Sequence, residues 1–237
     1  MKKHVKKIHE QKHNVLVNVI IPSAGVGRRM KSYGCKSLLT INNEKLIDIQ
    51  LKHITNVFEK HEVILITGFD SDRLINHSPS NLIKIENEKY YENNVVRSIC
   101  IGLRATKDND HVLIIFGDVL FNQNCLDHID VNQSSIIISN DMGDNEVGCN
   151  MSPKGYLEYM MFDLPNKWGH MIYLTGKELT LFKKMVCNKS LERKFCFEVI
   201  NDVINMGGKF KCITDDNIKT MDIDTSKDLQ IAQEFIK

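Results

Sequence analysis

Short apolar runs alternate with amphipathic stretches over the first 140 residues of the chain. The apolar runs, which are rich in branched residues, predict buried strands at residues 15–21, 62–68, 81–86, 111–118 and 134–139. Between them, apolar residues recur at helical spacing over residues 46–58, 71–75 and 93–105. This alternation predicts the α/β class, with a Rossmann-like, mostly parallel sheet flanked by helices.

The second half of the chain has a less regular pattern. Residues 141–174 mix short polar and aromatic pieces without a helical period, so we interpret them as strands and loops of a small acceptor or lid region. Further elements are predicted as helices at residues 177–186, 191–204 and 226–236 and as strands at residues 209–213 and 219–224. Because no linker rich in proline, glycine or serine divides the chain, we expect a single domain over residues 15–237.

The overall composition narrows the function only by exclusion. The formal net charge is +1 over 237 residues, which gives no global attraction to nucleic acid or to an anionic membrane. The hydrophobic fraction of 42% is ordinary for a globular protein. No apolar run approaches the length of a membrane span, so none is predicted.

The N-terminal residues 1–14, MKKHVKKIHEQKHN, are basic and lack the apolar core and cleavage site of a secretory signal. We expect a solvated arm or a short leading helix, and recruitment of an acidic partner is the alternative. None of the seven cysteines (35, 100, 125, 149, 187, 196 and 212) forms a C-x-x-C pair. Their scattered spacing predicts reduced thiols in a cytoplasmic protein.

A glycine-bearing loop with positive charge follows the first predicted strand directly. The loop, SAGVGRRM, spans residues 23–30. Gly25 and Gly27 allow backbone N–H groups to approach an anion closely, and the two arginines add charge, so the loop is interpreted as a phosphate cradle. It lacks the third glycine of the dinucleotide fingerprint and the Gly-Lys-Ser ending of a P-loop. A G-x-G pattern is also compatible with an ordinary turn.

Three further features fall at predicted strand ends, where the ligands of an open parallel sheet bind. Lys36 lies in the same strand-end loop, although a lysine by itself is usually a solvated charge. Asp118 follows an apolar run and could ligate Mg²⁺ or cap a helix. Asp222 and Asp224 alternate on a short strand and are expected to point the same way, so one of them could share the metal. Asp224 or Thr225 could equally cap the last helix.

Taken in order, these pieces resemble the nucleotidyltransferases of the glycosyltransferase-A-like fold. SAGVGRRM resembles the signature loop, ENNVVRSICIGL the segment beside the nucleobase, and IKTMDIDTSKDLQIA the closing strand and helix. The resemblance covers residues 15–236. FGDVLF and KSLLTI favour the small cytidylyltransferases of the phosphocholine and 2-aminoethylphosphonate types. The methylerythritol-phosphate cytidylyltransferases carry Asp-Ala-Ala-Arg in place of FGDVLF and are less similar.

The resemblance implies a reaction in which an acceptor phosphate or phosphonate oxygen attacks the α-phosphorus of a nucleoside triphosphate, with CTP favoured, and pyrophosphate leaves. It implies catalytic roles for Lys36 at the α-phosphate and for Arg29 at the β- and γ-phosphates. It places the cofactor Mg²⁺ on Asp118 and Asp224, with Asp222 as a further candidate. The implied nucleotide-binding residues are Ser23, Ala24, Gly25, Val26, Gly27, Arg28, Gly68, Asn93, Asn94 and Ser98.

Two positions depart from the pattern of the family. The family usually has proline before its lysine, whereas this chain has Cys35, so a looser approach of the lysine is expected. The family often opens with Leu-Ala-Ala-Gly, whereas this chain has Pro22, Ser23 and Ala24, and Ser23 could add a hydroxyl near the base or ribose.

The acceptor is less well defined by the sequence. A cationic head such as choline or an aminoethyl group requires carboxylates or aromatic faces. The candidates are Tyr156, Tyr159, Asp163, Trp168, Tyr173 and Glu198. Trp168, the single tryptophan, could instead pack in the core or face an interface. Lys167 and His170 could hold the acceptor phosphate or simply lie on the surface.

Several rival functions remain open at this point. A sugar-1-phosphate nucleotidyltransferase would use the same residues with a different acceptor. A metal-dependent glycosyltransferase usually needs two aspartates one residue apart after the fourth strand, and Asp118-Val119-Leu120 lacks the second. An inactive nucleotide-sensing relative would be expected to lack Arg29, Lys36 or Asp118. A nucleic-acid binder is disfavoured because the cations form no patch with interleaved aromatics, and a homodimer is left open.

Overall fold

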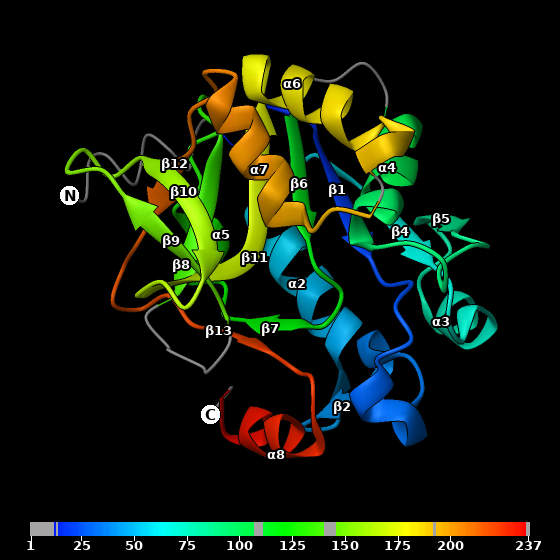
Figure 1. Cartoon of the computed structure of the whole chain (residues 1–237). Coiled ribbons are helices and arrows are strands. Elements are labelled where there is room, and N and C mark those ends of the chain that lie inside the picture. The colour runs from blue at the N-terminus through cyan, green and yellow to red at the C-terminus, as the bar shows by residue number, and fades with distance from the viewer. Residues whose placement is uncertain (1–11, 13, 107–110, 140–145, 192, 236–237) are drawn as a thin grey trace.

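The computed structural model describes residues 12, 14–106, 111–139, 146–191 and 193–235. Within these residues a central sheet of nine strands has helices on both faces (Figure 1). The strands of this sheet are β1 (Val17–Pro22), β4 (His61–Thr67), β5 (Ile83–Glu86), β6 (His111–Ile115), β8 (Ser135–Ser139), β9 (Val147–Met151), β10 (Leu157–Phe162), β11 (Asn166–Thr175) and β12 (Lys211–Ile213). They lie in the order β10-β9-β11-β6-β1-β4-β5, with β8 beside β11 and β12 beside β8.

The part of the sheet that contains β1 is parallel. β1 pairs in parallel with β4 and β6, and β4 pairs in parallel with β5. All six residues of β1 are buried, with Val19 and Ile21 in the core on one face of the sheet and Ile20 in the core on the other. A strand that is buried on both faces has a continuous apolar sequence, which is why β1 could be predicted from the sequence. The predicted α/β class is confirmed.

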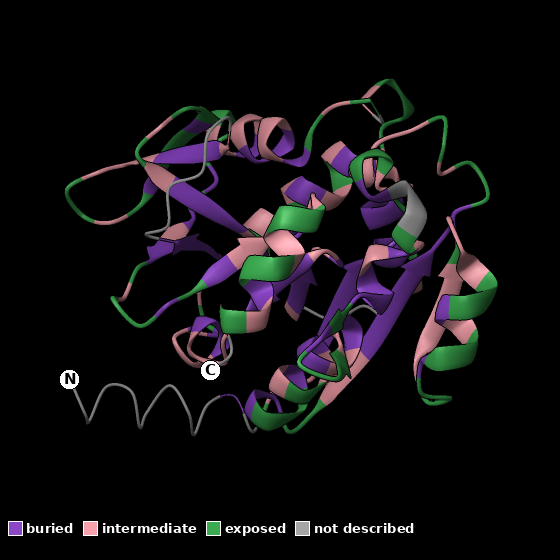
Figure 2. Ribbon diagram, turned by 90° about the horizontal axis from the view of Figure 1, so that it is seen from below, coloured by how far each residue is buried: buried purple, intermediate pink, exposed green. Residues whose placement is uncertain are grey.

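Helices on the two faces enclose two hydrophobic cores, and Figure 2 shows the buried sheet between more exposed helices. The helices that contribute to one core are α4 (Val95–Ala105), α6 (Gly176–Val186) and α7 (Cys196–Asn205). The helices that contribute to the other are α2 (Leu46–Val57), α3 (Ser71–His77) and α5 (Asn124–Asp127). The last helix, α8 (Ser226–Phe235), packs through Ala232 on a third, smaller cluster near the hairpin of β2 (Thr40–Ile41) and β3 (Glu44–Lys45).

The region expected to be a lid is built differently from that expectation. β11 lies inside the main sheet, antiparallel to β6, β8 and β9, so residues 166–175 belong to the core. β9 and β10 extend the same sheet at its edge. A helix predicted over residues 191–204 begins only at Cys196, after a short 3₁₀ turn, η3 (Lys189–Leu191). Residues 141–145 of the predicted lid lie outside the described residues.

A small second ribbon was not predicted from the sequence. β7 (Val119–Phe121) pairs antiparallel with β13 (Thr220–Asp222), although their residues are about a hundred positions apart in the chain. The sequence predicted a strand around β13, at residues 219–224, but not β7, whose three residues are too short for a periodic signal. Their pairing brings the C-terminal aspartates beside the loop that follows β6.

Lys12 does not fit the expectation of a solvated arm. It is buried, and its Nζ donates to the carbonyl oxygens of Leu126 and Asp127, each at 2.7 Å. These carbonyls lie at the C-terminal end of α5, where the last carbonyl groups of a helix have no N–H partner within the helix. Burial lowers the pKa of Lys12 to about 8. Residues 1–11 and 13 of the predicted arm lie outside the described residues, and no described helix is long and apolar enough to cross a membrane.

Gly102 sets how closely α4 approaches β1, and its replacement should be costly. A Cβ at this position would lie 2.6 Å from Cγ2 of Ile20, a branched side chain that cannot swing away. We expect Gly102→Ala to lower the free energy of unfolding by about 1–3 kcal/mol, measured by urea denaturation. In a Gly102→Ala/Ile20→Ala protein the loss should be smaller than the sum of the two single losses. A Gly102→Ala protein as stable as the parent would contradict this packing.

Candidate functional site

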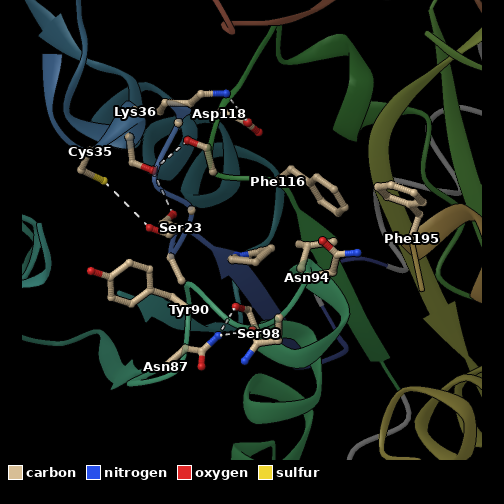
Figure 3. A pocket seen from close by; sticks show the side chains of 18 residues that line it. Ser23, Cys35, Lys36, Asn87, Tyr90, Asn94, Ser98, Phe116, Asp118 and Phe195 are labelled. Atoms are coloured by element: carbon tan, nitrogen blue, oxygen red, sulfur yellow. Dashed lines mark hydrogen bonds and ion pairs between the residues drawn. The ribbon is translucent and has the colours of Figure 1, made fainter. Parts of the chain in front are cut away.

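A pocket of about 320 Å³ opens at the carboxyl ends of β1 and β6, where the parallel arrangement predicts a ligand site. Its lining comes from the loop after β1, the turn after β6, the segment before α4 and the start of α7. Figure 3 shows Lys36 and Asp118 at one end, Asn87 and Ser98 at the other, and Phe116, Asn94 and Phe195 along one side. The pocket therefore joins segments that lie between Pro22 and Phe195 in the chain.

The loop after β1 has the backbone features of a phosphate cradle. Ser23, Ala24, Gly25 and Gly27 line the pocket. Gly27 adopts a left-handed conformation with φ of 56°, which glycine tolerates without strain. A Cβ on Gly27 would also lie 3.1 Å from Cε of Lys36, so the glycine leaves room for the lysine stem. Nothing lies within 4 Å of a Cβ built on Gly25, so the backbone there is open to a ligand.

Lys36 lies between two aspartates that come from distant parts of the chain. Its Nζ donates to Oδ2 of Asp118 at 3.0 Å and to Oδ1 of Asp224. Arg29 pairs with the other oxygen of Asp224 at 2.5 Å. Burial by itself would lower the pKa of Lys36, but Asp118 and Asp224 outweigh it and raise that pKa above its ordinary value. The lysine is therefore held as a cation at the pocket wall.

Asp118 lies in a tight turn whose backbone is held from several sides. Gly117 donates from its N–H to the Pro22 carbonyl at 3.2 Å, and its own carbonyl accepts from Oγ of Ser37 at 2.8 Å. The carbonyl of Asp118 accepts from the N–H of Ile223 at 3.0 Å. A Cβ on Gly117 would lie 2.1 Å from Oγ of Ser23, so only glycine fits there. The turn is thus tied to the β1 loop and to the C-terminal segment.

The opposite end of the pocket is polar and uncharged. Asn87 donates through Nδ2 to Oδ1 of Asn93 at 3.0 Å and to Oγ of Ser98 at 3.1 Å. Tyr90 also lines the pocket, and Asn94 lies along its side. Amide and hydroxyl groups of this kind suit the edge of a nucleobase, which presents donors and acceptors but no charge. The structure thus brings the predicted Asn93, Asn94 and Ser98 together.

Some predicted nucleotide-binding residues lie elsewhere. Gly68 does not line the pocket but packs behind the β1 loop, where a Cβ would lie 2.8 Å from Cβ of Ala24. Arg28 is exposed, and Val26 is not part of the lining. Conversely, Ser37, Asn87, Tyr90, Phe116 and Phe195 line the pocket but were not singled out from the sequence. Only Phe116 carried a usable signal, because it directly precedes Gly117 and Asp118.

The strand alternation predicted that Asp222 and Asp224 point the same way, and this prediction is wrong. β13 ends at Asp222, and Asp224 lies beyond it. Asp222 accepts from Nδ1 of His170 at 2.8 Å and lies 3.6 Å from Nζ of Lys167. Although burial opposes ionisation, His170 and Lys167 lower the pKa of Asp222 to about 2. Asp222 is therefore engaged by cations on β11, while Asp224 is engaged by Arg29 and Lys36.

The cap that the sequence predicted for the start of α8 is present, and it is formed by Thr225 with Asp228 rather than by the side chain of Asp224. Oδ2 of Asp228 accepts from the N–H groups of Asp224 and Thr225 at 3.0 and 2.7 Å. Oγ1 of Thr225 accepts from the N–H of Asp228 at 3.2 Å. Thr225 and Asp228 thus cap the helix reciprocally, and the carboxylate of Asp224 is left for the ion pairs with Arg29 and Lys36.

The aromatic acceptor candidates on β11 are buried rather than exposed. Trp168 is 2% exposed, and its ring packs edge-on against the rings of Phe116 and His170. Its Nε1 donates to the Met171 carbonyl at 3.3 Å. Tyr173 is also buried and bonds through its hydroxyl to Nδ1 of His111 at 2.8 Å. Because both side chains are buried on a core strand, Trp168 and Tyr173 are not retained as candidates for contact with the acceptor.

The remaining acceptor candidates have varied settings. Lys167 is buried and pairs with Glu146 at 3.0 Å. Glu198 accepts from the N–H of Phe195 at 2.7 Å at the start of α7. Asp163, Tyr156 and Tyr159 lie at the surface of the β9–β10 hairpin region.

Phe195 adds an aromatic surface at the rim of the pocket. It is 52% exposed, and its ring stacks on Phe197 with centroids 5.8 Å apart. The ring of Phe162 meets both rings edge-on.

The residues present fit a magnesium ion that completes its shell with substrate. Mg²⁺ is usually held by one or two carboxylates together with phosphate oxygens. Asp118 and Asp224 supply two carboxylates that converge on the same nitrogen of Lys36. Among the described residues no group of three or more His, Cys, Asp or Glu side chains could hold a metal by itself. Asp118 and Asp224 therefore suit a metal that arrives with the triphosphate.

The fold and this pocket define an α/β protein with a candidate site for a phosphorylated ligand at the carboxyl ends of its strands. Residues 19–135 match the family model of the MobA-like NTP transferase domain. Residues 19–135 therefore form a nucleotidyltransferase domain, which confirms the resemblance drawn from the sequence. The match includes the β1 loop, Lys36 and Asp118.

Solved structures of nucleotidyltransferases share the fold. The CTP:phosphocholine cytidylyltransferase from Streptococcus pneumoniae is 14% identical, with a TM-score of 0.78 over 94% of this chain and 100% of that chain. The inositol-1-phosphate CTP transferase from T. maritima is 15% identical, with a TM-score of 0.76 over 93% and 95%. A UDP-glucose pyrophosphorylase complexed with UDP-glucose is 12% identical, with a TM-score of 0.76 over 93% and 98%. A search of curated proteins found no match.

The expected looseness at Cys35 is offset by a hydrogen bond. The N–H of Cys35 donates to Oδ2 of Asp70 at 3.3 Å, a bond that proline could not make. Cys35 nevertheless has φ of −62° and ψ of 126°, the conformation that proline prefers, and Gly34 before it is compatible with a following proline. Asp70 thus restrains the start of the turn that carries Lys36.

This restraint predicts a compensating pair of substitutions. Asp70→Gly, which suits the left-handed backbone at this position, removes the bond to Cys35 and an exposed ion pair with Arg73, and it should weaken binding of the nucleoside triphosphate about three- to tenfold. Cys35→Pro should have little effect in the parent and should restore most of the affinity in the Asp70→Gly protein. Isothermal titration calorimetry on the four proteins measures this. A Cys35→Pro/Asp70→Gly protein that binds no better than Asp70→Gly would contradict it.

The pair of His170 and Asp222 predicts a dependence of stability on pH. Burial opposes a charged imidazole, but Asp222 raises the pKa of His170 above its ordinary 6.5, while the pKa of Asp222 falls from 3.8 to about 2. The histidine contribution is complete below 6.5 and is lost as pH rises through the raised pKa. The aspartate contribution is complete above 3.8 and is lost as pH falls towards 2.

Asp222→Asn should therefore cost most stability between about pH 4 and 6.5. The cost should shrink at higher pH without vanishing, because Lys167 still faces Asp222 in the parent. Urea denaturation of both proteins from pH 4 to 9 measures the difference. A difference that does not change with pH would contradict the pairing.

Proposed function

We propose that this nucleotidyltransferase is an Mg²⁺-dependent cytidylyltransferase that joins CTP to a small phosphate or phosphonate acceptor and releases pyrophosphate. The convergence of Lys36 on Asp118 and Asp224 is the observation that carries this proposal. It supports a single centre where cations from the first loop meet carboxylates from the turn after β6 and from the C-terminal segment.

The reaction sets a clear electrostatic requirement. An acceptor oxygen forms a bond to the α-phosphorus of CTP while the bond from that phosphorus to the bridging oxygen of pyrophosphate breaks. Both reactants are anions, so the site must align them and neutralise the charge that develops on the α-phosphate. An ionised phosphate or phosphonate needs no strong general base.

Each part of the pocket would meet one of these requirements. The N–H groups of residues 24–27 and Arg29 would hold the β- and γ-phosphates, and Lys36 would neutralise the α-phosphate. Asp118 and Asp224 would hold Mg²⁺, which when bound neutralises phosphate oxygens and links them to the protein. Asn93, Asn94 and Ser98 would contact the base, with Asn87 bonding to Asn93 and Ser98 from behind.

The preference for CTP and for a cationic acceptor rests on separate support. Two of the structural neighbours are named for transfer from CTP. Phe195 lines the pocket and contacts the rings of Phe162 and Phe197, and Asp163 directly follows Phe162. Ring faces with a nearby carboxylate suit the head of phosphocholine or of 2-aminoethylphosphonate. A sugar 1-phosphate is the alternative acceptor, which has no charged head and would gain little from these rings.

A substrate screen tests the proposal directly. Pyrophosphate release would be measured for CTP, UTP, ATP and GTP, each with phosphocholine, 2-aminoethylphosphonate and several sugar 1-phosphates. We expect CTP with a cationic phosphate or phosphonate to give the fastest release. Faster release with a sugar 1-phosphate would establish the alternative acceptor class.

Lys36→Ala tests the electrostatic core of the mechanism. Removal of one such donor to the developing charge should slow turnover about 10²–10³-fold with the best substrate pair. The matched control is Lys52→Ala, since Lys52 forms only an exposed pair with Glu44 at 3.7 Å. The control should retain parental activity. Near-parental release of pyrophosphate by Lys36→Ala would remove the lysine from the mechanism.

A further inference from the structure

Gln50 is a buried polar side chain on α2, a helix that otherwise contributes apolar residues to the core. Its side chain is fully buried, and the neighbouring inward positions are Leu46, Ile47, Ile49 and Ile54. An amide in such a setting is unfavourable unless it forms hydrogen bonds. The reason for glutamine at this position must therefore be sought in its contacts.

The amide nitrogen of Gln50 spans the turn that carries Asp118. Its Nε2 donates to the Phe116 carbonyl at 3.0 Å and to the Val119 carbonyl at 2.8 Å. These two residues are the ends of the four-residue turn, and the N–H of Val119 also donates to the Phe116 carbonyl at 3.2 Å. The Oε1 of Gln50 has no partner within the described part of the chain. The side chain of Gln50 thus contacts this turn through hydrogen bonds that its NH₂ group donates.

The contacts of Gln50 add a restraint on the turn from α2. Ser37 and Pro22 hold Gly117, and Ile223 holds the carbonyl of Asp118. Without Gln50, the carbonyls of Phe116 and Val119 would lose their link to α2. The carboxylate of Asp118 could then shift relative to Lys36 and Asp224, and a shift of about 1 Å is enough to cost a large factor in rate.

We propose that Gln50 is a positioning residue that fixes the carboxylate of Asp118 for its metal and for Lys36. The inference rests on the proposed function, because it assigns Gln50 to the same centre. Gln50 touches neither substrate nor metal and acts through the backbone of residues 116–119. The glutamine side chain is suited to this task because one NH₂ group can donate to two carbonyls at once.

The test compares three variants of the full chain. Gln50→Leu keeps the approximate size of the side chain and removes both donors. Val57→Ala, two turns further along α2 and buried, is the control for loss of core packing. Asp118→Asn reports whether the carboxylate itself is needed. The measurements are the thermal midpoint, kcat and KM with the best substrate pair from the screen, and Mn²⁺ affinity in the presence of CTP by electron paramagnetic resonance.

We expect Gln50→Leu to lower kcat at least tenfold and to weaken Mn²⁺ binding about three- to tenfold, with a small change in the KM for CTP. Val57→Ala should leave kcat and Mn²⁺ affinity near the parental values even where its thermal midpoint falls as far. Equal effects of Gln50→Leu and Val57→Ala would reduce Gln50 to core packing and overturn the inference. So would a Gln50→Leu protein with parental kcat and metal affinity. Near-parental activity and Mn²⁺ affinity of Asp118→Asn would overturn the metal site of the proposed function, and the inference with it.

Discussion

The ion pairs of Lys36 with Asp118 and Asp224 are the constraint on which the candidate site depends. The lysine follows β1, Asp118 follows β6, and Asp224 lies just before the last helix, so these pairs close the chain over almost its full length. The half-buried lysine lies beside carboxylates that are about one-third exposed. Charges in that setting attract more strongly than surface pairs, because less water screens them.

The fold itself brings Lys36 and Asp118 together. Parallel strands end at one edge of the sheet, so the loops after β1 and β6 are neighbours without any special arrangement. The C-terminal aspartate needs a separate device, because no strand of the main sheet brings it there. The pairing of β7 with β13 brings Asp224 to the site. The hydrogen bond from the N–H of Ile223 to the carbonyl of Asp118 joins the C-terminal segment to the turn that carries Asp118.

The sequence predicted the elements whose pattern is periodic and the residues that lie at strand ends. β1, β4 and α4 carry long apolar signals, and Lys36 and Asp118 follow directly from where strands stop. The sequence could not place Trp168 and Tyr173, because the core strand that carries them, which has a bulge, was interpreted as part of an acceptor or lid region. It also could not assign Gln50 or Asp70, whose roles are set by distant carbonyl and N–H groups rather than by local pattern. The Asp222–His170 pair was missed because two neighbouring aspartates were expected to act together.

The balance of charges in the site has a consequence for how substrates enter. Lys36 and Arg29 face Asp118 and Asp224, while Lys167 and His170 face Asp222 and Glu146, so each group of cations already has carboxylate partners. Nζ of Lys36 has three N–H donors and two of them already face Asp118 and Asp224, so a phosphate oxygen that takes the third would lie beside two carboxylates. Lys36 and Arg29 can turn to phosphate oxygens at low cost only when Asp118 and Asp224 have another cation. On this argument the proposed function requires the nucleotide and its metal to bind with strong mutual dependence, whereas Asp222 is already engaged by His170 and Lys167.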